Sequence, residues 1–515
     1  MEKRRLESLN MIEKNIDKIG ALFPNVITEH RDATGKLKKT INFALLKQLL
    51  SDDLVDGDEA YEFTWVGKKA SILEAGKPSK NTLHPSKEKS KNWDTTGNLY
   101  IEGDNLDVLK LLQESYNNSI KMIYIDPPYN TGKDFIYRDN FTVPKDVYEN
   151  NMRFFDEEKN HLFQNHDSSG RFHSDWCSMM YPRLKLARNL LSDDGTIFIS
   201  IDDNEVENLK KIGNEVFGES NFVGQWNWFK SATPANLSKK IKKNIEYILC
   251  YEKSKNSIKY RGLMKTSKSN NGLMNQTNSF SKLVFPANKV DTKLKNGVYR
   301  KGKYGTRSYE INLLEDTEVY DGFFIKEVIL EGRFKWGQDN LNREMSNGTI
   351  ISIKTNAFSP SYEKAKYDPE VPPSLIDEKT KVDTTENAGK YLKELFDGIN
   401  VFDYPKPVSL IKYLIGFNDD KDSIILDFFS GSSTTAQAVM ELNAEDGGHR
   451  KFIMVQLPEK CGADSAAAKG GYATICEIGQ ERIRRAGEII EVNKSADEKV
   501  DIGFRVLKLE NDKLQ

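Results

Sequence analysis

The stretch KMIYIDPPYNTG, Lys121–Gly132, joins a short apolar run to a rigid turn. Its apolar half is typical of a buried β-strand, and its two adjacent prolines fix the backbone φ angles and remove two N–H donors. In a parallel sheet, ligands bind at the carboxyl ends of the strands. This stretch therefore predicts a strand that presents a carboxylate, a backbone carbonyl and an aromatic ring together at a ligand-binding edge.

Strand-like and helix-like segments alternate on both sides of this stretch. Apolar runs cover 99–101, 196–201, 423–428 and 451–456, and helical spacing covers 106–112, 175–191, 204–216 and 434–443. Such alternation predicts an α/β fold with a parallel sheet. We expect four parts: a helical N-terminal region over 1–90, the first half of an α/β domain over 91–224, an insertion over 225–396, and the second half with a C-terminal segment over 397–515.

The composition excludes several classes of protein. The chain has 515 residues, a net charge of −2, 38% hydrophobic residues and 30% charged residues, which is typical of a soluble globular protein. The charged start, Met1–Arg5, predicts no signal peptide, and no run approaches the roughly 18 apolar residues of a membrane span. The four cysteines form no CxxC pair, so we expect no zinc site, no disulfide framework and a cytoplasmic location.

The insertion concentrates the basic charge of the chain. From Lys230 to Arg307 there are 19 Lys and Arg residues against three acidic residues, a net charge of +16, so the other residues sum to −18. Aromatic residues lie among these cations, a combination typical of contact with a nucleic-acid backbone. The candidate phosphate contacts are Lys239, Lys240, Lys242 and Lys243. The alternative is a solvated lysine-rich loop.

The residues Asp126, Pro127, Pro128 and Tyr129 suit the binding of a flat ring that carries an amino group. The Tyr129 ring can stack on such a ligand, while the Asp126 carboxylate and the Pro127 carbonyl accept hydrogen bonds from an exocyclic NH₂. The alternative is an Asp-Pro turn that only closes the strand.

Two further strand ends carry candidate ligand-binding residues. The segment 427–435 has the order strand, small-residue turn and helix, which is the geometry of an adenosine-type cofactor pocket. It lacks the GxGxxG pattern of a dinucleotide site and the lysine of a P-loop. Asp104 and Asn105 follow the strand at 99–101, where a carboxylate can bind the hydroxyl or amino groups of a cofactor. The alternatives are a plain βα turn for the first and a helix N-cap for the second.

The residues His173, Ser174 and Asp175 suggest a hydrolase triad. Adjacent residues point in different directions, however, and triads are assembled from distant segments. We therefore interpret this stretch as the start of a helix.

The order of these motifs resembles the β group of amino-methylating DNA methyltransferases, and within it the modification subunit of type III restriction–modification systems. The DPPY motif precedes Asp427-Phe428-Phe429-Ser430-Gly431, and a long insertion lies between them. Further matching stretches are 64–69, 99–112, 124–134, 172–191, 198–205, 405–407 and 503–506. The resemblance covers nearly the whole chain except the insertion.

This resemblance implies a circularly permuted Rossmann-like methyltransferase sheet, with a catalytic half over 91–224, a target-recognition domain over 225–396 and a cofactor-binding half over 397–515. It implies transfer of a methyl group from S-adenosyl-L-methionine to N6 of adenine in double-stranded DNA, without a metal. The implied partners are a second copy of the chain and an ATP-dependent restriction subunit. Catalysis is expected of Asp126, Pro127, Pro128 and Tyr129. Cofactor binding is expected of Asp104, Asn105, Lys406, Asp427, Phe428, Phe429, Gly431, Ser433, Thr434 and Gln456.

Two positions depart from the pattern of the resemblance. Ser433 replaces the last glycine of the Phe-x-Gly-x-Gly loop, and a serine adopts a positive φ less readily than a glycine. Gln456 stands where many methyltransferases carry an acidic residue, with Glu459 nearby. Two alternatives stay open: methylation of cytosine N4, since the same grip suits any exocyclic amine, and a non-catalytic DNA-binding specificity subunit.

Overall fold

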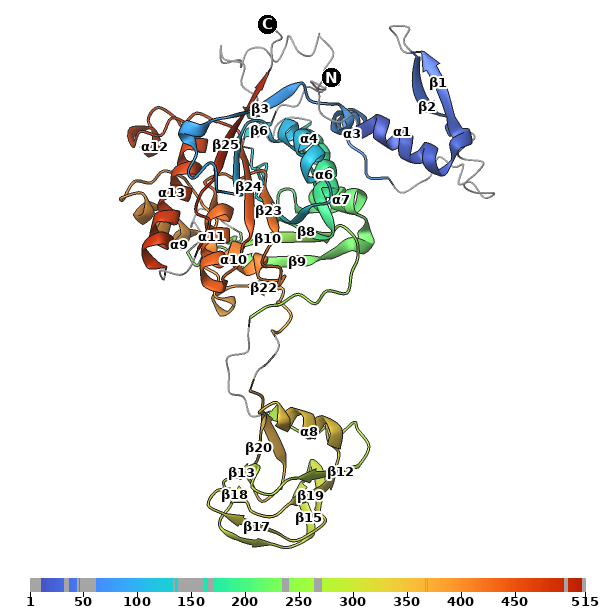
Figure 1. The fold of residues 1–515 in the computed structure, drawn as a ribbon, viewed down its shortest axis with the longest axis vertical. Coiled ribbons are helices and arrows are strands. Elements are labelled where there is room, and N and C mark those ends of the chain that lie inside the picture. The colour runs from blue at the N-terminus through green and yellow to red at the C-terminus, as the bar shows by residue number, and fades with distance from the viewer. Residues whose placement is uncertain are drawn as a thin grey trace. The chain divides into compact units, whose positions relative to one another are not determined.

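The computed structural model describes residues 11–31, 37–43, 46, 62–132, 135–137, 162–164, 171–233, 240–263, 271–365, 367, 369–494 and 499–511. The chain divides into two compact units (Figure 1). Unit 1 comprises Met1–Tyr260 and Pro372–Gln515, and unit 2 comprises Arg261–Val371. The chain leaves unit 1 and returns to it, so unit 2 is an insertion.

Unit 1 is built on a ten-stranded sheet. Its strands, in order across the sheet, are β22 (Leu375–Ile376), β9 (Phe222–Phe229), β10 (Ile245–Glu252), β8 (Leu191–Ile201), β5 (Ile120–Ile125), β23 (Ile424–Asp427), β24 (Lys451–Gln456), β4 (Leu99–Glu102), β25 (Arg505–Asn511) and β3 (Asn81–Pro85). The neighbours from β8 to β25 pair in parallel, whereas β9, β10 and β3 join by antiparallel pairing. The predicted α/β fold with a parallel sheet is confirmed.

The two halves of the sequence interleave within this sheet. The strands β23 and β24, from the second half, lie between β5 and β4, from the first half. Leu426 of β23 pairs with Ile123 of β5, and Val455 of β24 pairs with Ile101 of β4. The later part of the chain thus supplies the centre of the sheet. This is the permuted Rossmann-like arrangement that the family resemblance implied.

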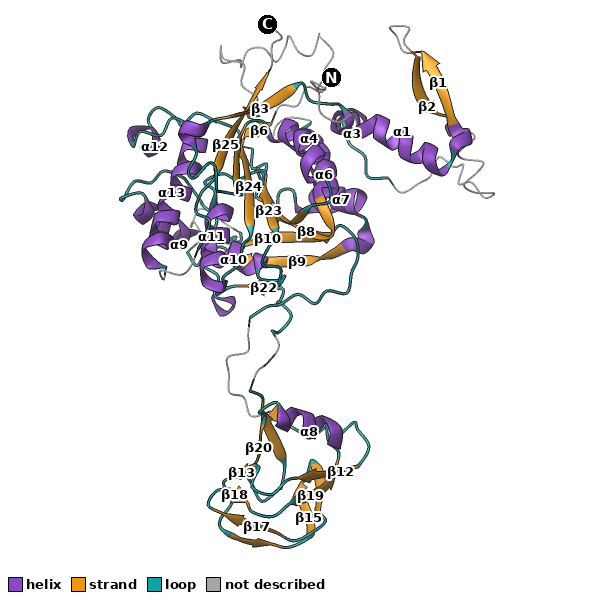
Figure 2. Cartoon of the chain, in the orientation of Figure 1, coloured by secondary structure: helices purple, strands orange, loops and turns teal. Residues whose placement is uncertain are grey.

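Helices cover both faces of the sheet (Figure 2). The alternation of side chains along a strand explains this, because Ile123 and Ile125 of β5 belong to one hydrophobic core and Met122 and Tyr124 to the other. The first core takes helices α4 (Asn105–Tyr116), α6 (Phe172–Leu190) and α7 (Val206–Phe217). The second takes α10 (Val408–Ile415), α11 (Thr434–Asp446) and α13 (Ile475–Asn493). The other α-helices among the described residues of unit 1 are α1 (Met11–Leu22), α3 (Lys68–Gly76), α9 (Thr385–Leu395) and α12 (Ala466–Lys469).

The N-terminal region is not wholly helical, so that prediction is wrong in part. After α1, the strands β1 (Ile27–Arg31) and β2 (Leu37–Ile41) form an antiparallel pair. The pairs Ile27–Ile41 and Thr28–Thr40 place β-branched residues opposite one another, a combination that favours a strand over a helix. Another short pair joins β6 (Phe135–Tyr137) and β7 (Leu162–Gln164).

In its described residues, unit 2 consists of two β-sheets and one α-helix, α8 (Gln338–Ser346), around its own core, which includes Phe285, Phe324 and Phe358. The first sheet has the order β11 (Asn271–Gly272), β21 (Pro360–Glu363), β20 (Ile350–Ile353), β13 (Val290–Thr292), β18 (Phe323–Phe324), β17 (Thr317–Tyr320) and β14 (Gly297–Tyr299). The second has the order β12 (Ser281–Phe285), β19 (Val328–Gly332), β16 (Tyr309–Leu313) and β15 (Gly302–Thr306).

The predicted insertion, 225–396, is wider than unit 2. Its first part forms β9 and β10, which extend the sheet of unit 1, and its last part forms β22 and α9 of the same unit. Trp226 and Trp228 of β9 are buried in the second core of unit 1, and this packing holds β9 in the sheet of unit 1. Within the described ranges, no helix is long and apolar enough to cross a membrane.

Candidate active site at the carboxyl edge of the sheet

Two loops leave the sheet side by side at its carboxyl edge. Asp126–Tyr129, the DPPY loop, follows β5, and Phe428–Ser433, the serine loop, follows the adjacent strand β23. The next strand of this sheet after β5 is β8, on one side, and the next after β23 is β24, on the other side. The strand order therefore reverses between β5 and β23, where a crevice for a ligand forms.

The DPPY loop is anchored from helices α6 and α7. Trp176 Nε1 donates to the Pro128 carbonyl at 2.7 Å, and Asn130 Nδ2 donates to Glu205 Oε1 at 2.5 Å. The carboxylate of Glu205 is fully buried, so these bonds hold the loop against a fixed point. The Pro127 carbonyl accepts no hydrogen bond from the described residues and so keeps its acceptor capacity for a ligand.

The first residue of this loop, Asp126, belongs to a cluster of four charged side chains. Lys406 Nζ lies 2.8 Å from Asp126 Oδ2 and 3.3 Å from Glu246 Oε2. The Tyr129 hydroxyl lies 2.8 Å from Asp126 Oδ1 and 3.0 Å from Glu246 Oε2, and it accepts from Lys406 at 2.9 Å. Lys230 Nζ completes the set at 2.8 Å from Glu246 Oε1. Two carboxylates and two ammonium groups thus balance in charge.

Three groups of the cluster, Lys406, Glu246 and Tyr129, have shifted pKa values that keep them in the form their neighbours require. Burial lowers the pKa of Lys406, but Asp126 and Glu246 reverse this and raise it above the ordinary value. Burial raises the pKa of Glu246, but Lys406 and Lys230 lower it overall. Burial and the two carboxylates hold the pKa of Tyr129 well above its usual range, so its hydroxyl stays protonated and donates.

The serine loop is shaped by hydrogen bonds to its own backbone. Asp427 accepts from the Phe429 N–H at 3.1 Å and from the Thr435 hydroxyl at 2.6 Å. The Gly431 N–H donates to Gln456 Oε1 at 2.8 Å. Ser433 has φ 64° and ψ 38°, so it adopts the left-handed conformation that a glycine would favour. The departure from the glycine pattern therefore leaves the turn intact.

A buried arginine that the sequence did not single out supports the same loop. Arg482, from α13, donates to Ser432 Oγ at 2.8 Å, Thr434 Oγ1 at 2.7 Å and Gln437 Oε1 at 2.8 Å. Burial lowers the pKa of Arg482 to about 10. The signal in the sequence was weak, because Arg482 stands in a run of basic residues that resembles an exposed helix face.

The residues Asp104 and Asn105 lie at the neighbouring end of β4. Asp104 caps α4 by accepting from the Leu106 N–H at 2.9 Å, as the N-cap alternative proposed. Asn105 is buried and donates from Nδ2 to the Phe428 carbonyl at 2.7 Å, while Arg183 Nε donates to its Oδ1 at 2.6 Å. Asn105 thus ties the two halves of the sheet together at the serine loop.

The groups at this edge fit an adenosine-type cofactor. The loop presents small side chains, and Ser430 Oγ is buried without a hydrogen-bond partner in the described part of the chain. Asp104 and Glu459 supply carboxylates at the ends of β4 and β24, and burial raises the pKa of Glu459 to about 7. These donors and acceptors suit ring nitrogens and hydroxyl groups.

The structure brings together most of the predicted site residues, and it gives one of them, Lys406, a partner that was not predicted. Asp427, Phe428, Phe429, Gly431, Ser433, Thr434 and Gln456 lie on or beside the serine loop. Lys406 was predicted to bind the cofactor. Its side chain instead reaches Asp126, and its backbone carbonyl accepts from the hydroxyl of Thr434, directly after the serine loop, at 3.2 Å. Glu246 and Lys230 were missed, because the sequence placed them in a basic insertion.

The stretch at His173 is the start of helix α6, which begins at Phe172, as interpreted. The His173 ring nitrogen Nδ1 lies 2.7 Å from Glu205 Oε1, so the histidine has a carboxylate partner and not a serine. No group of metal-ligating side chains appears in the described ranges.

The candidate phosphate contacts lie in the turn between β9 and β10. Lys239 is outside the described residues, whereas Lys240, Lys242 and Lys243 are exposed. This turn lies at the carboxyl edge of the sheet, because Tyr247 of β10 pairs with Ile201 at the end of β8. Lys243 also pairs with Asp203 at 3.1 Å. These lysines therefore stand on the same edge as the DPPY loop.

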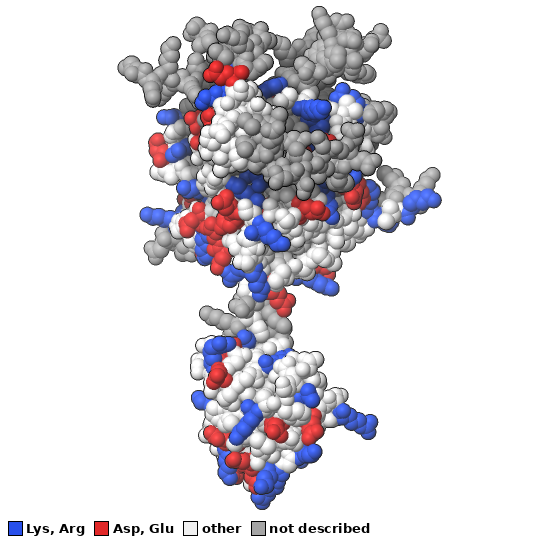
Figure 3. Space-filling view, turned by 90° about the vertical axis from the view of Figure 1, so that its right-hand side faces the viewer, with Lys and Arg blue, Asp and Glu red and all other residues white. Residues whose placement is uncertain are grey.

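The basic charge is shared between the units. Unit 2 has 18 Lys and Arg residues against 13 acidic residues, a net charge of +5. Basic and acidic side chains are mixed over its surface in the view of Figure 3. The charge of +16 over 230–307 was therefore not a property of one domain, because residues 230–260 belong to unit 1.

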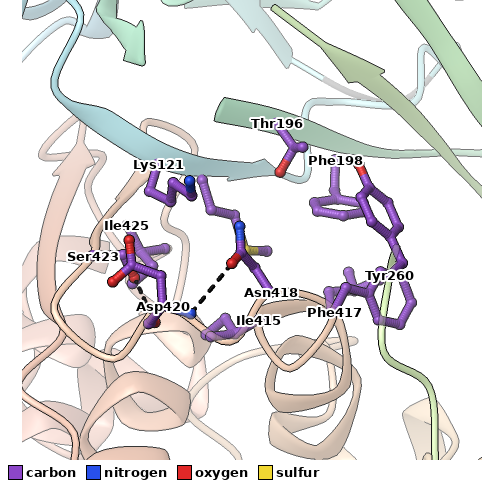
Figure 4. Close-up of a pocket in the computed structure, with 12 residues that line it drawn as sticks. Lys121, Thr196, Phe198, Tyr260, Ile415, Phe417, Asn418, Asp420, Ser423 and Ile425 are labelled. Carbon is purple, nitrogen blue, oxygen red and sulfur yellow. Dashed lines mark hydrogen bonds between the residues drawn. The ribbon is translucent and has the colours of Figure 1, made fainter. Parts of the chain in front are cut away.

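A small pocket in unit 1 lies away from this site (Figure 4). Its lining includes Lys121 and Ser423, which stand at the amino ends of β5 and β23, together with the aromatic rings of Phe198, Tyr260 and Phe417. Asp126 and Asp427 stand at the opposite ends of these strands. The pocket thus lies at the amino ends of the strands, opposite the DPPY loop and the serine loop.

A permuted sheet with a rigid carboxylate loop beside an adenosine-type loop is the arrangement of a methyltransferase that acts on an amino group. A model of the N6/N4 methyltransferase family, described as DNA methylase, matches residues 120–488. The type III restriction-modification enzyme StyLTI Mod subunit of Salmonella typhimurium is 35% identical over 89% of this chain and 67% of its own length. The EcoP15I Mod subunit of Escherichia coli is 34% identical over 90% of this chain and 73% of its own.

The EcoPI Mod subunit of Escherichia phage P1 is 32% identical over 90% of this chain and 73% of its own length. The chain belongs to the N6/N4 DNA methyltransferase family and, within it, to the type III Mod subunits. The predicted class, a DNA methyltransferase of a restriction–modification system that uses S-adenosyl-L-methionine, is confirmed.

Proposed function

We propose that this chain transfers a methyl group from S-adenosyl-L-methionine to N6 of adenine in double-stranded DNA, at a specific site. The observation that carries the proposal is the position of Asp126, whose carboxylate stands beside the Tyr129 ring at the end of β5, next to the loop of β23. Its side chain is 28% exposed, so a ligand can reach it.

The groups of the DPPY loop bind and orient the target amine. The lone pair of adenine N6 is delocalised into the ring, so this nitrogen is a poor nucleophile. Hydrogen bonds from its two hydrogens to the Asp126 carboxylate and the Pro127 carbonyl favour a pyramidal nitrogen, and the Tyr129 ring stacks on the flipped base. The rigid loop thereby positions the nitrogen for direct, in-line attack.

The cofactor, when bound, supplies an electrophilic sulfonium methyl group. The residues that hold it are those of the serine loop, with Gln456 and the carboxylates of Asp104 and Glu459 at the neighbouring strand ends. No covalent enzyme intermediate is required, and none of the four cysteines follows a proline, as the nucleophile of cytosine-C5 methyltransferases does.

The partners follow from the chemistry of the surface and from the relatives. Lys240, Lys242 and Lys243 contact phosphates near the flipped base, and unit 2 contributes to recognition of the target sequence. The relatives are subunits of type III restriction-modification enzymes, so we propose a pair of these chains with an ATP-dependent restriction subunit.

The test is incorporation of tritiated methyl groups from S-adenosyl-L-methionine into DNA of mixed sequence by the full chain. We expect incorporation, with modified adenines at one short site when the product is sequenced on single molecules. DNA binding without incorporation would instead favour a non-catalytic specificity subunit.

A further inference from the structure

Protein donors already occupy both oxygens of the Asp126 carboxylate. Oδ2 faces Lys406 Nζ at 2.8 Å, and Oδ1 accepts from the Tyr129 hydroxyl at 2.8 Å. Each of these oxygens can accept one more hydrogen bond, so a target amine that donates to Asp126 shares the carboxylate with two donors that are already in place. A second acceptor for these two donors allows the carboxylate to turn toward the amine.

Glu246 is such an acceptor for both of them. Its Oε2 lies 3.0 Å from the Tyr129 hydroxyl and 3.3 Å from Lys406 Nζ, so each donor changes partner by a small movement. Its other oxygen is held by Lys230 at 2.8 Å, and its side chain is only 8% exposed. Glu246 is thus fixed in place, on a strand, with one oxygen directed at the two donors of Asp126.

The charge of Glu246 matters because Lys406 is buried. The Lys406 side chain is 10% exposed, and an ammonium in such a place is costly unless an anion faces it. When Asp126 turns to the target amine, Glu246 keeps Lys406 neutralised. Without this second anion, Asp126 is the one carboxylate that the described residues place against Lys406, and Lys406 holds it more strongly.

We propose that Glu246 is a positioning residue that accepts the hydrogen bonds of Lys406 and Tyr129 when the target amine binds, and so frees Asp126 for methyl transfer. This inference rests on the proposed function, in which Asp126 accepts from the amine. Glu246 itself touches neither the base nor the cofactor in this scheme.

The test is Glu246→Gln, with Glu252→Gln as the matched control. Both residues are buried carboxylates of β10, and Glu252 lies at the other end of the strand, beside Asn256 and Tyr260. In single turnovers of the full chain on its DNA, we expect Glu246→Gln to slow methyl transfer by at least about tenfold, the value of one charged hydrogen bond. S-adenosyl-L-methionine and DNA should bind within about twofold of the wild type, and Glu252→Gln should transfer at the normal rate.

A second variant tests the role of Lys406 in holding Asp126. Adding Lys406→Met to Glu246→Gln removes the ammonium that captures Asp126, so the double variant should transfer faster than Glu246→Gln alone. A normal rate for Glu246→Gln, an equal loss for Glu252→Gln, or a double variant no faster than Glu246→Gln would overturn the inference. A failure of the proposed function itself has another sign, which is methyl transfer that survives Asp126→Ala.

Discussion

At the scale of single residues, the site is defined by carboxylates in different environments. Asp126 is partly exposed, so a ligand can reach it, although its oxygens also face Lys406 and the Tyr129 hydroxyl. Asp427, on the adjacent strand, is buried and accepts from the Phe429 N–H and the Thr435 hydroxyl, so it shapes the loop. Two aspartates at neighbouring strand ends thus serve chemistry and architecture separately.

The buried state of Asp427 predicts a pH dependence of stability. Burial raises its pKa to about 7, although bonds from Thr435 and Phe429 oppose this. The folded chain therefore keeps a proton, between about pH 4 and pH 7, that the unfolded chain has lost, so stability falls as the pH rises through this range and then levels. Asp427→Asn removes the titrating group. The unfolding free energy of the wild type minus that of the variant should therefore be about 3 kcal/mol smaller at pH 8 than at pH 5. Urea unfolding of both proteins at the two pH values measures this difference, and the same difference at both pH values would refute the assignment.

At the scale of elements, helix α13 packs closely against the serine loop because its residue 479 is a glycine, which has no side chain. A Cβ atom at Gly479 would lie 2.5 Å from Ser433 Oγ and 2.9 Å from the Tyr100 hydroxyl. The helix therefore approaches closely enough for Arg482 to reach the loop only because residue 479 is a glycine.

This packing predicts a pair of substitutions that compensate each other. Gly479→Ala should lower the unfolding free energy by about 1–3 kcal/mol because it overpacks a buried contact. Adding Ser433→Gly removes the nearest clash and should recover part of the loss. Thermal unfolding measures both, with Gly389→Ala of helix α9, where a Cβ meets open space, as the control. Equal stability of Gly479→Ala and the wild type would contradict the packing.

The turn between β9 and β10 predicts a salt dependence of DNA binding. If Lys240 and Lys242 contact phosphates, changing both to alanine should weaken DNA binding and reduce the slope of log K against log salt by about 0.9 for each contact. The control is alanine at Lys421 and Lys451, which lie at the amino ends of β23 and β24. Fluorescence anisotropy at several salt concentrations gives the slopes, and an unchanged slope for the first pair would remove this turn from the interface.

At the scale of the whole molecule, the sequence predicted the sheet and both loops because their signals are local. A helix, a strand and a turn follow one another over 105–129, and a strand, a turn and a helix over 424–446, so periodicity and turn chemistry identify them. The N-terminal hairpin and the extent of the insertion were not predictable in this way. The strands β9 and β10 belong to unit 1 through pairing with β8, a contact that no local pattern contains.

The same reason explains why part of the site was missed. Glu246 and Lys230, more than one hundred residues after Asp126, join its charge cluster only once β10 has paired with β8 and β9. In the sequence, Glu246 is one acidic residue in a basic stretch. Lys406 carried a signal, its place between two prolines, but the signal indicated a cofactor contact instead of an ion pair with Asp126.

The central claim is that this molecule methylates N6 of adenine and that Asp126 accepts from the target amine. The most direct measurement digests DNA treated with the full chain and S-adenosyl-L-methionine to nucleosides and identifies the products by mass spectrometry. The account predicts N6-methyldeoxyadenosine from the wild type, and at least about 100-fold less from Asp126→Asn, which keeps its shape and its binding of DNA. N4-methyldeoxycytidine as the product, or undiminished methylation by Asp126→Asn, would contradict it.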